Sequence, residues 1–254
     1  MKSHRVIFIA AVVAALLLPS TASAADFDFP LKGWWPLNEG KGQTVKDWSG
    51  KGNHGYLGSS SSADSADPSW TKGIFFGSAL NFGGDDYITI KDSSSLEPQN
   101  LTVSAWVKAS SSPGQYQYVI AKGAQDCTTA SYALWSGWHG GLAFYIWDGT
   151  VQRNSGYIAS SEIWDGKWHH VAGTYDGTLT KLFVDGKLQS EGSSVTGPVD
   201  YNTGNGNTTI GGYVGTCDLL FTGDIDEVHI WSQPIAMDQV WNRWRWLLGI
   251  PGRI

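Results

Sequence analysis

The stretch KWHHVAGTYDGTLTKLFVDGKLQSE, residues 167–191, decides the fold class of this chain. It holds two Asp-Gly pairs, Asp176-Gly177 and Asp185-Gly186, each set between runs in which large apolar residues alternate with polar or small ones. An Asp-Gly pair tolerates the positive φ angles of a tight primed turn. Alternation with a period of two places one face of a strand on a core and the other in water. The stretch therefore predicts a meander of antiparallel strands.

Short strands closed by turn residues are predicted on both sides of the meander. They cover residues 33–37, 79–82, 87–90, 101–108, 118–123, 132–135, 142–147, 208–213 and 224–231. Many short strands with regular turn signals indicate an all-β antiparallel β-sandwich. A parallel α/β sheet is excluded because the chain lacks the helical periodicity of crossover helices. The Ser- and Asp-rich segment 59–69 is predicted to be a surface loop.

One short C-terminal helix is predicted at residues 234–248. Its apolar residues fall near one face, and Gly249 marks its end. We expect this helix to pack on the sandwich or to cap one end of it. In the alternative interpretation, Trp241, Trp244 and Trp246 form an exposed surface through which the protein contacts a partner or self-associates.

The first segment, residues 1–24, is predicted to be a cleavable secretory signal. Lys2 and Arg5 precede an apolar run at 6–18, and small residues follow. The run is short for a membrane span, and an uncleaved membrane anchor is the alternative. Residues 25–254 are predicted to form a single β-sandwich domain, and loss of the two basic residues changes the formal net charge from −6 to about −8.

Charge and hydropathy exclude two classes of partner. The chain is mildly acidic and has no basic stripe that could replace the counterions of phosphates, which excludes nucleic acid. No second apolar stretch approaches the length of a membrane span, so no membrane insertion is expected after signal removal.

The cysteines are a single pair, Cys127 and Cys217, in a chain predicted to be exported. In an oxidising compartment such a pair is expected to form a disulfide, which would constrain the unfolded chain by on the order of 4 kcal/mol. A redox-active or metal-binding thiol pair is the alternative, but no CxxC spacing or nearby His cluster supports it.

Most of the chain after the signal resembles one family of β-sandwiches. The ordered pieces that carry the resemblance are LNEGKGQTVKDWSGKGNHG (37–55), GSALNFGGDDYITI (77–90), LTVSAWVK (101–108), KWHHVAGTYDGTLTKLFVDGKL (167–188), TIGG (209–212) and FTGDIDEVHIW (221–231). They resemble the laminin G-like (LamG) family of the concanavalin A-like lectin/glucanase superfamily. The resemblance implies a concanavalin A-like jelly roll in which the N- and C-terminal strands lie side by side. Members of this superfamily mostly bind carbohydrate or protein ligands, and a site must still be argued separately.

The resemblance also implies a structural calcium ion. The segment DWSGKGN, residues 47–53, interleaves oxygen-bearing side chains with glycines, as a hard cation requires. Asp47, Asn53 and Asp226 occupy the family's matching positions, and Gly50 would add a carbonyl oxygen. In the alternative interpretation, Asp47 and Asn53 shape an Asx-type turn and Asp226 is a solvated residue of the rim.

Aromatic and polar residues that could bind a sugar gather between residues 126 and 153. Aromatic rings stack on the apolar faces of sugars, and Asp, Asn or Arg groups bond their hydroxyls. The predicted ligand-binding residues are Asp126, Trp135, Trp138, His139, Tyr145, Trp147, Asp148 and Arg153. Strand alternation offers the alternative that many of these aromatic residues belong to the core.

A disulfide would make part of this region rigid. A bond between Cys127 and Cys217 would hold two loops together at one end of the sandwich, and a loop held in this way loses less entropy on binding. The rim near the two cysteines, Asp126 and Trp138 is therefore the predicted ligand site.

No catalytic residues are predicted. Glucanases of this superfamily use the strand motif ExDxxE, and this chain has only Asp224, Asp226 and Glu227 in GDIDEV. His169 and His170 have no Ser or Cys nucleophile motif nearby. Because adjacent strand residues point to opposite faces, one of these two histidines is expected to be buried.

The sequence thus favours a secreted, non-catalytic protein that binds carbohydrate or another cell-surface ligand. The first alternative is a self-assembling structural protein of an extracellular layer or fibre. The second is a divergent glycoside hydrolase or polysaccharide lyase that uses Asp226 or Glu227.

Overall fold

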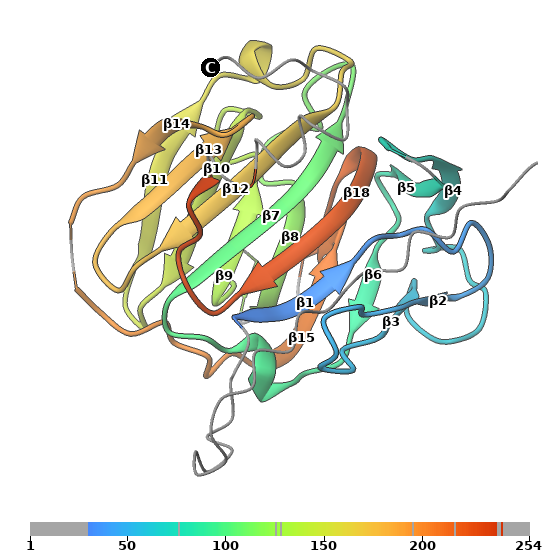
Figure 1. Ribbon diagram of the computed structural model, residues 1–254, viewed down its shortest axis with the longest axis horizontal. Coiled ribbons are helices and arrows are strands. Elements are labelled where there is room, and N and C mark those ends of the chain that lie inside the picture. Colours follow the sequence, from blue (N-terminus) through green and yellow to red (C-terminus); the bar gives the residue numbers. More distant parts are fainter. Residues whose placement is uncertain are drawn as a thin grey trace, which may run out of the picture.

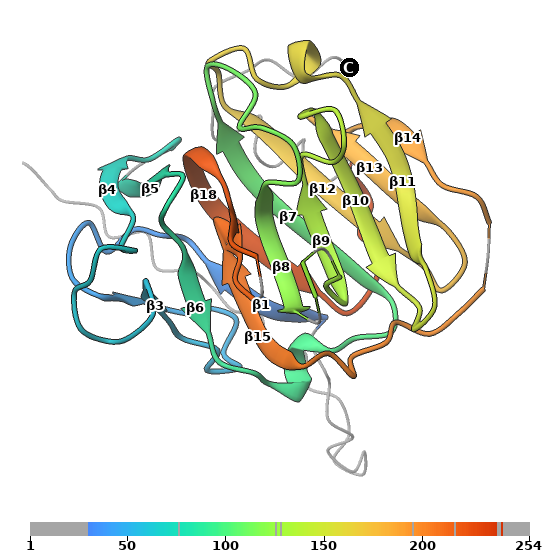
Figure 2. The same ribbon diagram turned by 180° about the vertical axis from the view of Figure 1, so that it is seen from behind.

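Two antiparallel β-sheets pack face to face in this computed structural model, which describes residues 30–75, 77–124, 126–127, 129–194, 196–215, 217–237 and 240 (Figure 1, Figure 2). The first, here named the meander sheet, has the order β14-β13-β12-β7-β18-β5-β4, and β1 also pairs with β18. Its strands are β1 (Leu31–Trp35), β4 (Ser69–Lys72), β5 (Ser78–Gly83), β7 (Leu101–Lys108), β12 (His169–Tyr175), β13 (Thr180–Val184), β14 (Lys187–Glu191) and β18 (Thr222–Trp231).

The second sheet has the order β11-β10-β9-β8-β15-β6-β3-β2, and β17 joins β16 to β8. Its strands are β2 (Thr44–Val45), β3 (Gly55–Leu57), β6 (Ile88–Ile90), β8 (Tyr118–Ala124), β9 (Tyr132–Trp135), β10 (Leu142–Trp147), β11 (Gln152–Ile158), β15 (Asn205–Ile210), β16 (Gly212–Tyr213) and β17 (Leu219–Leu220). Two short 3-10 helices, η1 (Ser94–Leu96) and η2 (Ser160–Glu162), lie in connections. The predicted antiparallel β-sandwich is confirmed.

The meander forms three neighbouring strands, as the sequence predicts, but its two turns differ. Asp185 and Gly186 have φ angles of 50° and 74° and form a tight turn between the paired residues Val184 and Lys187. Tyr175, by contrast, pairs with Thr180, so the other Asp-Gly pair lies in a longer loop. There the Asp176 carboxylate accepts the backbone N–H groups of Thr178 and Leu179 at 2.9 and 2.8 Å. This Asx-type turn replaces the predicted primed turn.

The other boundaries follow the prediction with local exceptions. Strand β1 ends before Pro36, which has no N–H for a ladder bond. The predicted strand at 208–213 is broken by Gly211, whose φ of 80° is outside the strand region. No strand is predicted from the sequence at β2, β3, β4, β11 or β17. The longest of these is β11, whose residues QRNSGYI show little apolar alternation.

A glycine in the middle of β12 shows how closely the sheets pack. Gly173 lies between Val171 and Tyr175, whose side chains are in the core. A Cβ atom at this position would lie 2.1 Å from the ring of Phe144 on β10 of the opposite sheet. The Phe144 ring thus fills the space that a side chain would need, which explains why the strand keeps a residue with poor strand propensity.

A disulfide joins Cys127 and Cys217, whose Cα atoms are 4.8 Å apart. The predicted pairing is therefore confirmed. The bond connects the segment after β8 to the segment before β17, and both segments lie outside the core formed between the sheets.

The predicted terminal elements lie largely outside the described residues. The predicted signal, 1–24, is outside them, as is the predicted helix beyond Val240. Within them, the N–H of Val240 donates to the carbonyl oxygen of Ala236 at 3.3 Å, which is a helical bond. No helix in the described ranges is long and apolar enough to cross a membrane.

The two adjacent histidines of the meander have different surroundings. His170 is buried, and this burial lowers its pKa to about 3. His169 hydrogen-bonds Asp185 through Nδ1 at 2.9 Å and Asp165 through Nε2 at 3.1 Å. The hydrogen bond to Asp185 is the main cause that raises the pKa of His169. The expectation that one of the two histidines is buried is confirmed.

The packing of Gly173 against Phe144 gives a first prediction. Gly173→Val should lower the free energy of unfolding by about 3 kcal/mol, because the added methyl groups overlap the ring. Urea unfolding measures this loss. In the double variant Gly173→Val/Phe144→Ala the two costs should be less than additive, whereas strictly additive costs would show that the two side chains do not compete for one space.

His169 gives a pH-dependent prediction. Its pKa is raised in the folded protein, so its stabilising contribution is complete below its ordinary pKa of about 6.5 and is lost as the pH rises through the folded pKa. Urea unfolding from pH 5 to pH 9 should show a cost of His169→Gln that is largest at acidic pH and disappears at alkaline pH. His139→Gln, at an exposed position, is the control. A cost for His169→Gln that does not vary with pH would contradict the assignment.

Candidate functional site

A second apolar cluster lies on the outer face of the second sheet, separate from the core. Small residues form its floor and buried aromatic residues rise from it; its members are Tyr118, Ala121, Ala124, Ala130, Ala133, Trp135, Ala143, Tyr145 and Tyr213. The hydroxyl of Tyr145 accepts the N–H of Ala130 at 3.0 Å, and the hydroxyl of Tyr213 donates to the carbonyl oxygen of Asp126. The loops beside the disulfide thus cover this cluster.

This burial corrects two predicted ligand contacts. Trp135 and Tyr145 were assigned to ligand binding, but both are fully buried and offer no ring face to a ligand. Strand alternation did direct both side chains away from the core between the sheets, and the loops then covered them. Trp135 and Tyr145 thus pack beneath the outer surface of the second sheet.

Four residues make an aromatic surface beside the cluster, here named the Trp138 platform: Tyr116, Trp138, His139 and Tyr157. The Trp138 side chain is 57% exposed, and its ring centroid lies 5.4 Å from that of Tyr116. Buried Trp135 contacts the rings of Tyr116 at 5.8 Å and Tyr157 at 6.4 Å. The half-buried rings of Tyr116 and Tyr157 therefore rest on the buried Trp135, and the exposed rings of Trp138 and His139 pack against them in turn.

The loops that carry the platform are tightly bonded to each other. The N–H of Tyr116, a residue with the unusual φ of 60°, donates to the carbonyl oxygen of Gly137 at 2.9 Å. The Ser136 hydroxyl donates to the carbonyl oxygen of Gly114 at 2.6 Å. A side chain at Gly137 would overlap the Tyr157 ring. A left-handed backbone at a non-glycine residue costs energy and persists only where its surroundings enforce it, so the platform is preorganised.

Polar groups lie at the edge of the platform. The hydroxyl of Tyr157 donates to the side-chain oxygen of Asn154 at 3.5 Å. Partial burial raises the pKa of Tyr157, and a hydrogen bond with Trp138 opposes this rise. The phenol is therefore neutral at physiological pH, and while its proton is donated to Asn154 its oxygen can accept a hydrogen bond from a sugar hydroxyl.

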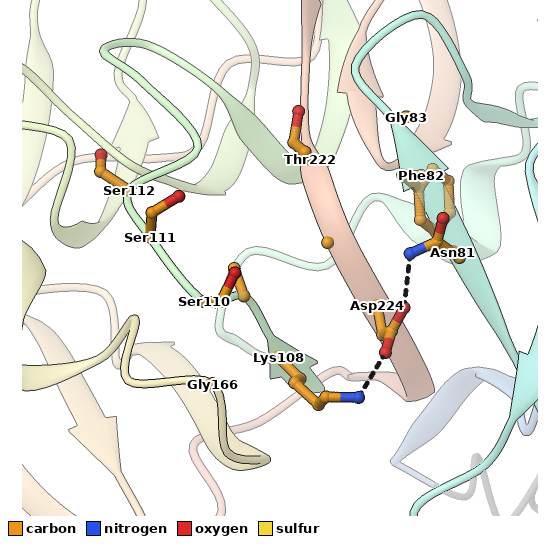
Figure 3. A pocket seen from close by; sticks show the side chains of 12 residues that line it. Asn81, Phe82, Gly83, Lys108, Ser110, Ser111, Ser112, Gly166, Thr222 and Asp224 are labelled. Carbon is orange, nitrogen blue, oxygen red and sulfur yellow. Dashed lines mark hydrogen bonds and ion pairs between the residues drawn. The ribbon is translucent and has the colours of Figure 1, made fainter.

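A polar pocket of about 340 Å³ lies at the same end of the sandwich as the platform (Figure 3). Its lining residues are Asn81, Phe82, Gly83, Lys108, Ala109, Ser110, Ser111, Ser112, Gly166, Thr222, Gly223 and Asp224. Strand register places three of them in one row, since Asp224 on β18 pairs with Lys108 on β7 and with Asn81 on β5. Lys108 Nζ lies 2.8 Å from one oxygen of Asp224, and Asn81 Nδ2 lies 2.6 Å from the other.

The loop between β7 and β8 connects the pocket to the platform. Its residue Ser112 lines the pocket and donates its hydroxyl proton to the carbonyl oxygen of Gly140 at 2.6 Å, beside His139. Tyr116 in the same loop belongs to the platform. The pocket opens on the outer face of the meander sheet, whereas the platform lies on the outer face of the second sheet.

The structure separates the residues of the predicted rim site. Strands β8 and β9 are antiparallel, and Tyr118 pairs with Trp135. Asp126 follows the end of β8 and Trp138 follows the end of β9, so these two residues lie at opposite ends of the hairpin. The disulfide lies beside Asp126. The predicted site near both cysteines, Asp126 and Trp138 is therefore not one surface.

Three further predicted residues lie at the far end of β10 from His139. Trp147 ends β10, Asp148 begins the turn that follows it, and Arg153 lies near the start of β11, where it pairs with Ile146. Arg153 Nε donates to Asp148 at 2.6 Å, and the N–H of Val151 donates to Asp148 at 2.8 Å. Hydrogen bonds of this kind hold the pKa of Asp148 well below its usual range, against the effect of burial. These contacts stabilise the turn. The predicted ligand-binding residues are thus divided between the two ends of β10.

The pocket residues Asn81, Lys108 and Asp224 were not among the predicted ligand residues. A signal for them was present, because Lys108 ends one predicted strand, Asp224 begins another and Asn81 lies one residue before the end of a third. Only the register between β5, β7 and β18 shows that they meet.

The predicted calcium ligands do not fit a calcium ion as they are folded. Both oxygens of Asp47 accept protein hydrogen bonds: one from the N–H groups of Trp34 and Ser49, the other from the Ser49 hydroxyl and the Asn53 N–H, all at 2.8 to 3.0 Å. The Asn53 side chain donates to the carbonyl oxygen of Lys32 and to Ser95. The Asx-type alternative describes this loop, in which Gly50 has a φ of 83°.

Asp226 is buried, so the solvated position at the rim that the alternative interpretation gives it is wrong. Its carboxylate accepts the N–H groups of Ile74 and Glu227, each at 2.9 Å. In the described part of the chain, no group of three or more His, Cys, Asp or Glu side chains could hold a metal ion.

Two buried carboxyl groups occupy the outer face of the meander sheet near His229. Burial raises the pKa of Asp226 to about 8 and that of Glu227 to about 7. Burial lowers the pKa of His229 to about 4. Glu227 has a φ of 49° at a bulge and accepts the indole N–H of Trp34 at 2.8 Å. Neither carboxyl group lines the pocket.

Comparisons with known proteins agree with this fold. A family model described as the concanavalin A-like lectin/glucanases superfamily matches residues 82–240, more than half of the chain. A comparison with curated proteins found no match. The chain is similar to domain 4 of AbnA, a GH43 extracellular arabinanase from Geobacillus stearothermophilus whose structure was solved with arabinotriose. The TM-score is 0.59 and the identity 21%, over 84% of this chain and 97% of that one.

A second similar structure is the binding domain of botulinum neurotoxin DC, solved in complex with SialylT. The TM-score is 0.62 and the identity 10%, over 86% of this chain. The chain spans about half of that domain, 51% of its length. At these identities the likeness concerns the fold. Together with the family match, it shows that this chain belongs to the concanavalin A-like lectin/glucanases superfamily.

Proposed function

We propose that this protein is an exported, non-catalytic carbohydrate-binding module whose ligand stacks on the Trp138 platform. The observation that carries the proposal is an exposed indole, 57% accessible, which packs on the half-buried Tyr116 ring, itself in contact with buried Trp135. A rigid aromatic surface bordered by hydrogen-bonding groups suits the apolar face of a sugar and its hydroxyls. Binding costs the ligand conformational entropy, but it costs the platform little, because its rings are already held in place.

The comparisons and the disulfide support this proposal. The similar arabinanase domain was solved with arabinotriose, which is an oligosaccharide. The Cys127–Cys217 bond is of a kind that persists in oxidising compartments, which supports export.

The alternatives have less support from the described residues. A hydrolase would need a pair of carboxyl groups that reach one substrate, but neither Asp226 nor Glu227 lines the pocket, and Asp224 is the one acidic residue among its described lining residues. The Trp-rich segment that would mediate self-assembly, from Trp241 onward, lies outside the described residues. The proposal needs no calcium ion.

Trp138 provides the test. Binding to a glycan array, followed by calorimetry with the strongest ligand, should show that Trp138→Ala weakens binding at least tenfold, which is about 1.4 kcal/mol. Trp48→Ala is a matched control, because Trp48 is 58% exposed but lies in the loop of Asp47. This control should retain full binding, and both variants should keep the melting temperature of the parent.

Two further measurements distinguish the alternatives. Binding should be equal in calcium and in chelator, because the Asp47 loop is closed by its own hydrogen bonds. No binding to any glycan, combined with very large particles in size-exclusion chromatography, would favour the structural protein instead. Equal losses in Trp138→Ala and Trp48→Ala would contradict the platform.

A further inference from the structure

We infer that the pocket lined by Lys108, Asp224 and Asn81 is a second carbohydrate subsite, which takes a neutral sugar through two adjacent hydroxyl groups (Figure 3). The inference rests on the proposed function, because it names the ligand as a sugar. It concerns a different surface from the Trp138 platform, so each surface can be tested separately.

The row of three side chains is fixed by strand register. The inner neighbours Val107 and Ile225 point into the core, so Lys108 and Asp224 point to the outer face of the meander sheet. Figure 3 shows Asp224 between Asn81 and Lys108, with a hydrogen bond on each side. The Asp224 carboxylate is thereby held in one orientation at the floor of the pocket.

This row offers donors and acceptors side by side. Each Asp224 oxygen accepts one of these bonds and, since a carboxylate oxygen has two lone pairs, keeps a second site for a ligand hydroxyl. The Lys108 ammonium uses one of its three protons on Asp224, and its side chain is 38% exposed. Adjacent sugar hydroxyls each donate and accept, and so match a carboxylate next to an ammonium group.

Serine and threonine hydroxyls extend this polar surface. Ser110, Ser111 and Ser112 approach the pocket from the loop after β7, and Thr222 approaches from the start of β18 (Figure 3). All four are exposed. A pocket of about 340 Å³ is at the small end of the range for small-molecule sites, as expected for one sugar unit rather than a long chain.

The charge around the pocket selects a neutral ligand. Lys108 is neutralised by Asp224 at 2.8 Å. Asp86 accepts the N–H of the lining residue Gly83, and Asp165 next to Gly166 is paired with Lys167. The whole chain carries a formal charge of −6. A carboxylate or sulfate on the ligand would meet Asp224 in a negative field, which disfavours acidic sugars.

Proton–nitrogen correlation NMR of the full chain can test the inference with simple probes. Glucose, arabinose, glucuronate and inorganic sulfate are each added at millimolar concentration. Glucose or arabinose should shift the side-chain amide signals of Asn81 and the backbone signals of Ser111, whereas glucuronate and sulfate should not. The Trp138 indole signal reports the platform in the same spectra.

Two variants and a matched control complete the experiment. Asp224→Asn removes the ion pair and should raise the dissociation constant measured from the Asn81 signals at least tenfold. The dissociation constant measured from the Trp138 signal should stay unchanged. Asn81→Ala, at an exposed position, is a second variant in case Asp224→Asn does not fold, and Ser111 then reports binding. Asp92→Asn is the control, because Asp92 pairs with Lys122 at 2.5 Å beside η1, at the opposite end of the sandwich (Figure 1).

The outcomes separate the two hypotheses. A shift of Trp138 without any shift of Asn81 or Ser111 would overturn the inference and leave the proposed function intact. If glucose and arabinose shift none of the Asn81, Ser111 and Trp138 signals, the result would count against both the inference and the proposed function. A stronger response to sulfate or glucuronate than to glucose and arabinose would make the pocket an anion site and overturn the inference.

Discussion

The pairing of β18 with β7 is the constraint on which the functional surfaces of this protein depend. This ladder joins β18, the last strand in the described part of the chain, to β7, which leads into the loop that contributes to both candidate sites. It aligns Asp224 with Lys108 in the pocket. Further along it places Asp226 opposite Trp106 and His229 opposite Ser104. A slip of one residue would turn every one of these side chains to the other face.

A bulge in β18 lets this strand stay paired with β7 on both sides of the bulge. The register shifts between Asp226 and His229, where Glu227 adopts a positive φ. One extra residue lets Ile225 and Val228 both point into the core, although they are three positions apart and an unbroken strand would separate them. The strain at Glu227 is offset by its hydrogen bond from Trp34 on β1 at 2.8 Å. The bulge thereby also secures the edge of the sheet.

Strands and covalent connections were predictable from the sequence, because they depend on local patterns. Short strands closed by turn residues identified β7, β9 and β10 at their observed bounds, and the Asp185-Gly186 turn follows from the φ angles that the pair tolerates. The site was less predictable, because alternation says which face a side chain takes but not what covers that face. Trp135 and Trp138 have similar chemistry and differ only in that loops enclose the first. Likewise, Asp126 and Trp138 are close in sequence, and only the direction of the β8–β9 hairpin separates them.

The loop between β7 and β8 connects the two surfaces mechanically. Ser112 bonds the carbonyl oxygen of Gly140 at 2.6 Å, and Ser136 in the platform loop bonds the carbonyl oxygen of Gly114 at 2.6 Å. The two loops therefore support each other through bonds that cross in both directions. The serines of the pocket and Tyr116 of the platform belong to this same loop, so a ligand that orders one part of the loop acts on a segment that both sites share. These bonds give coupling between the two subsites a contiguous physical route, which the Ser112 hydroxyl joins to the pocket that it also lines.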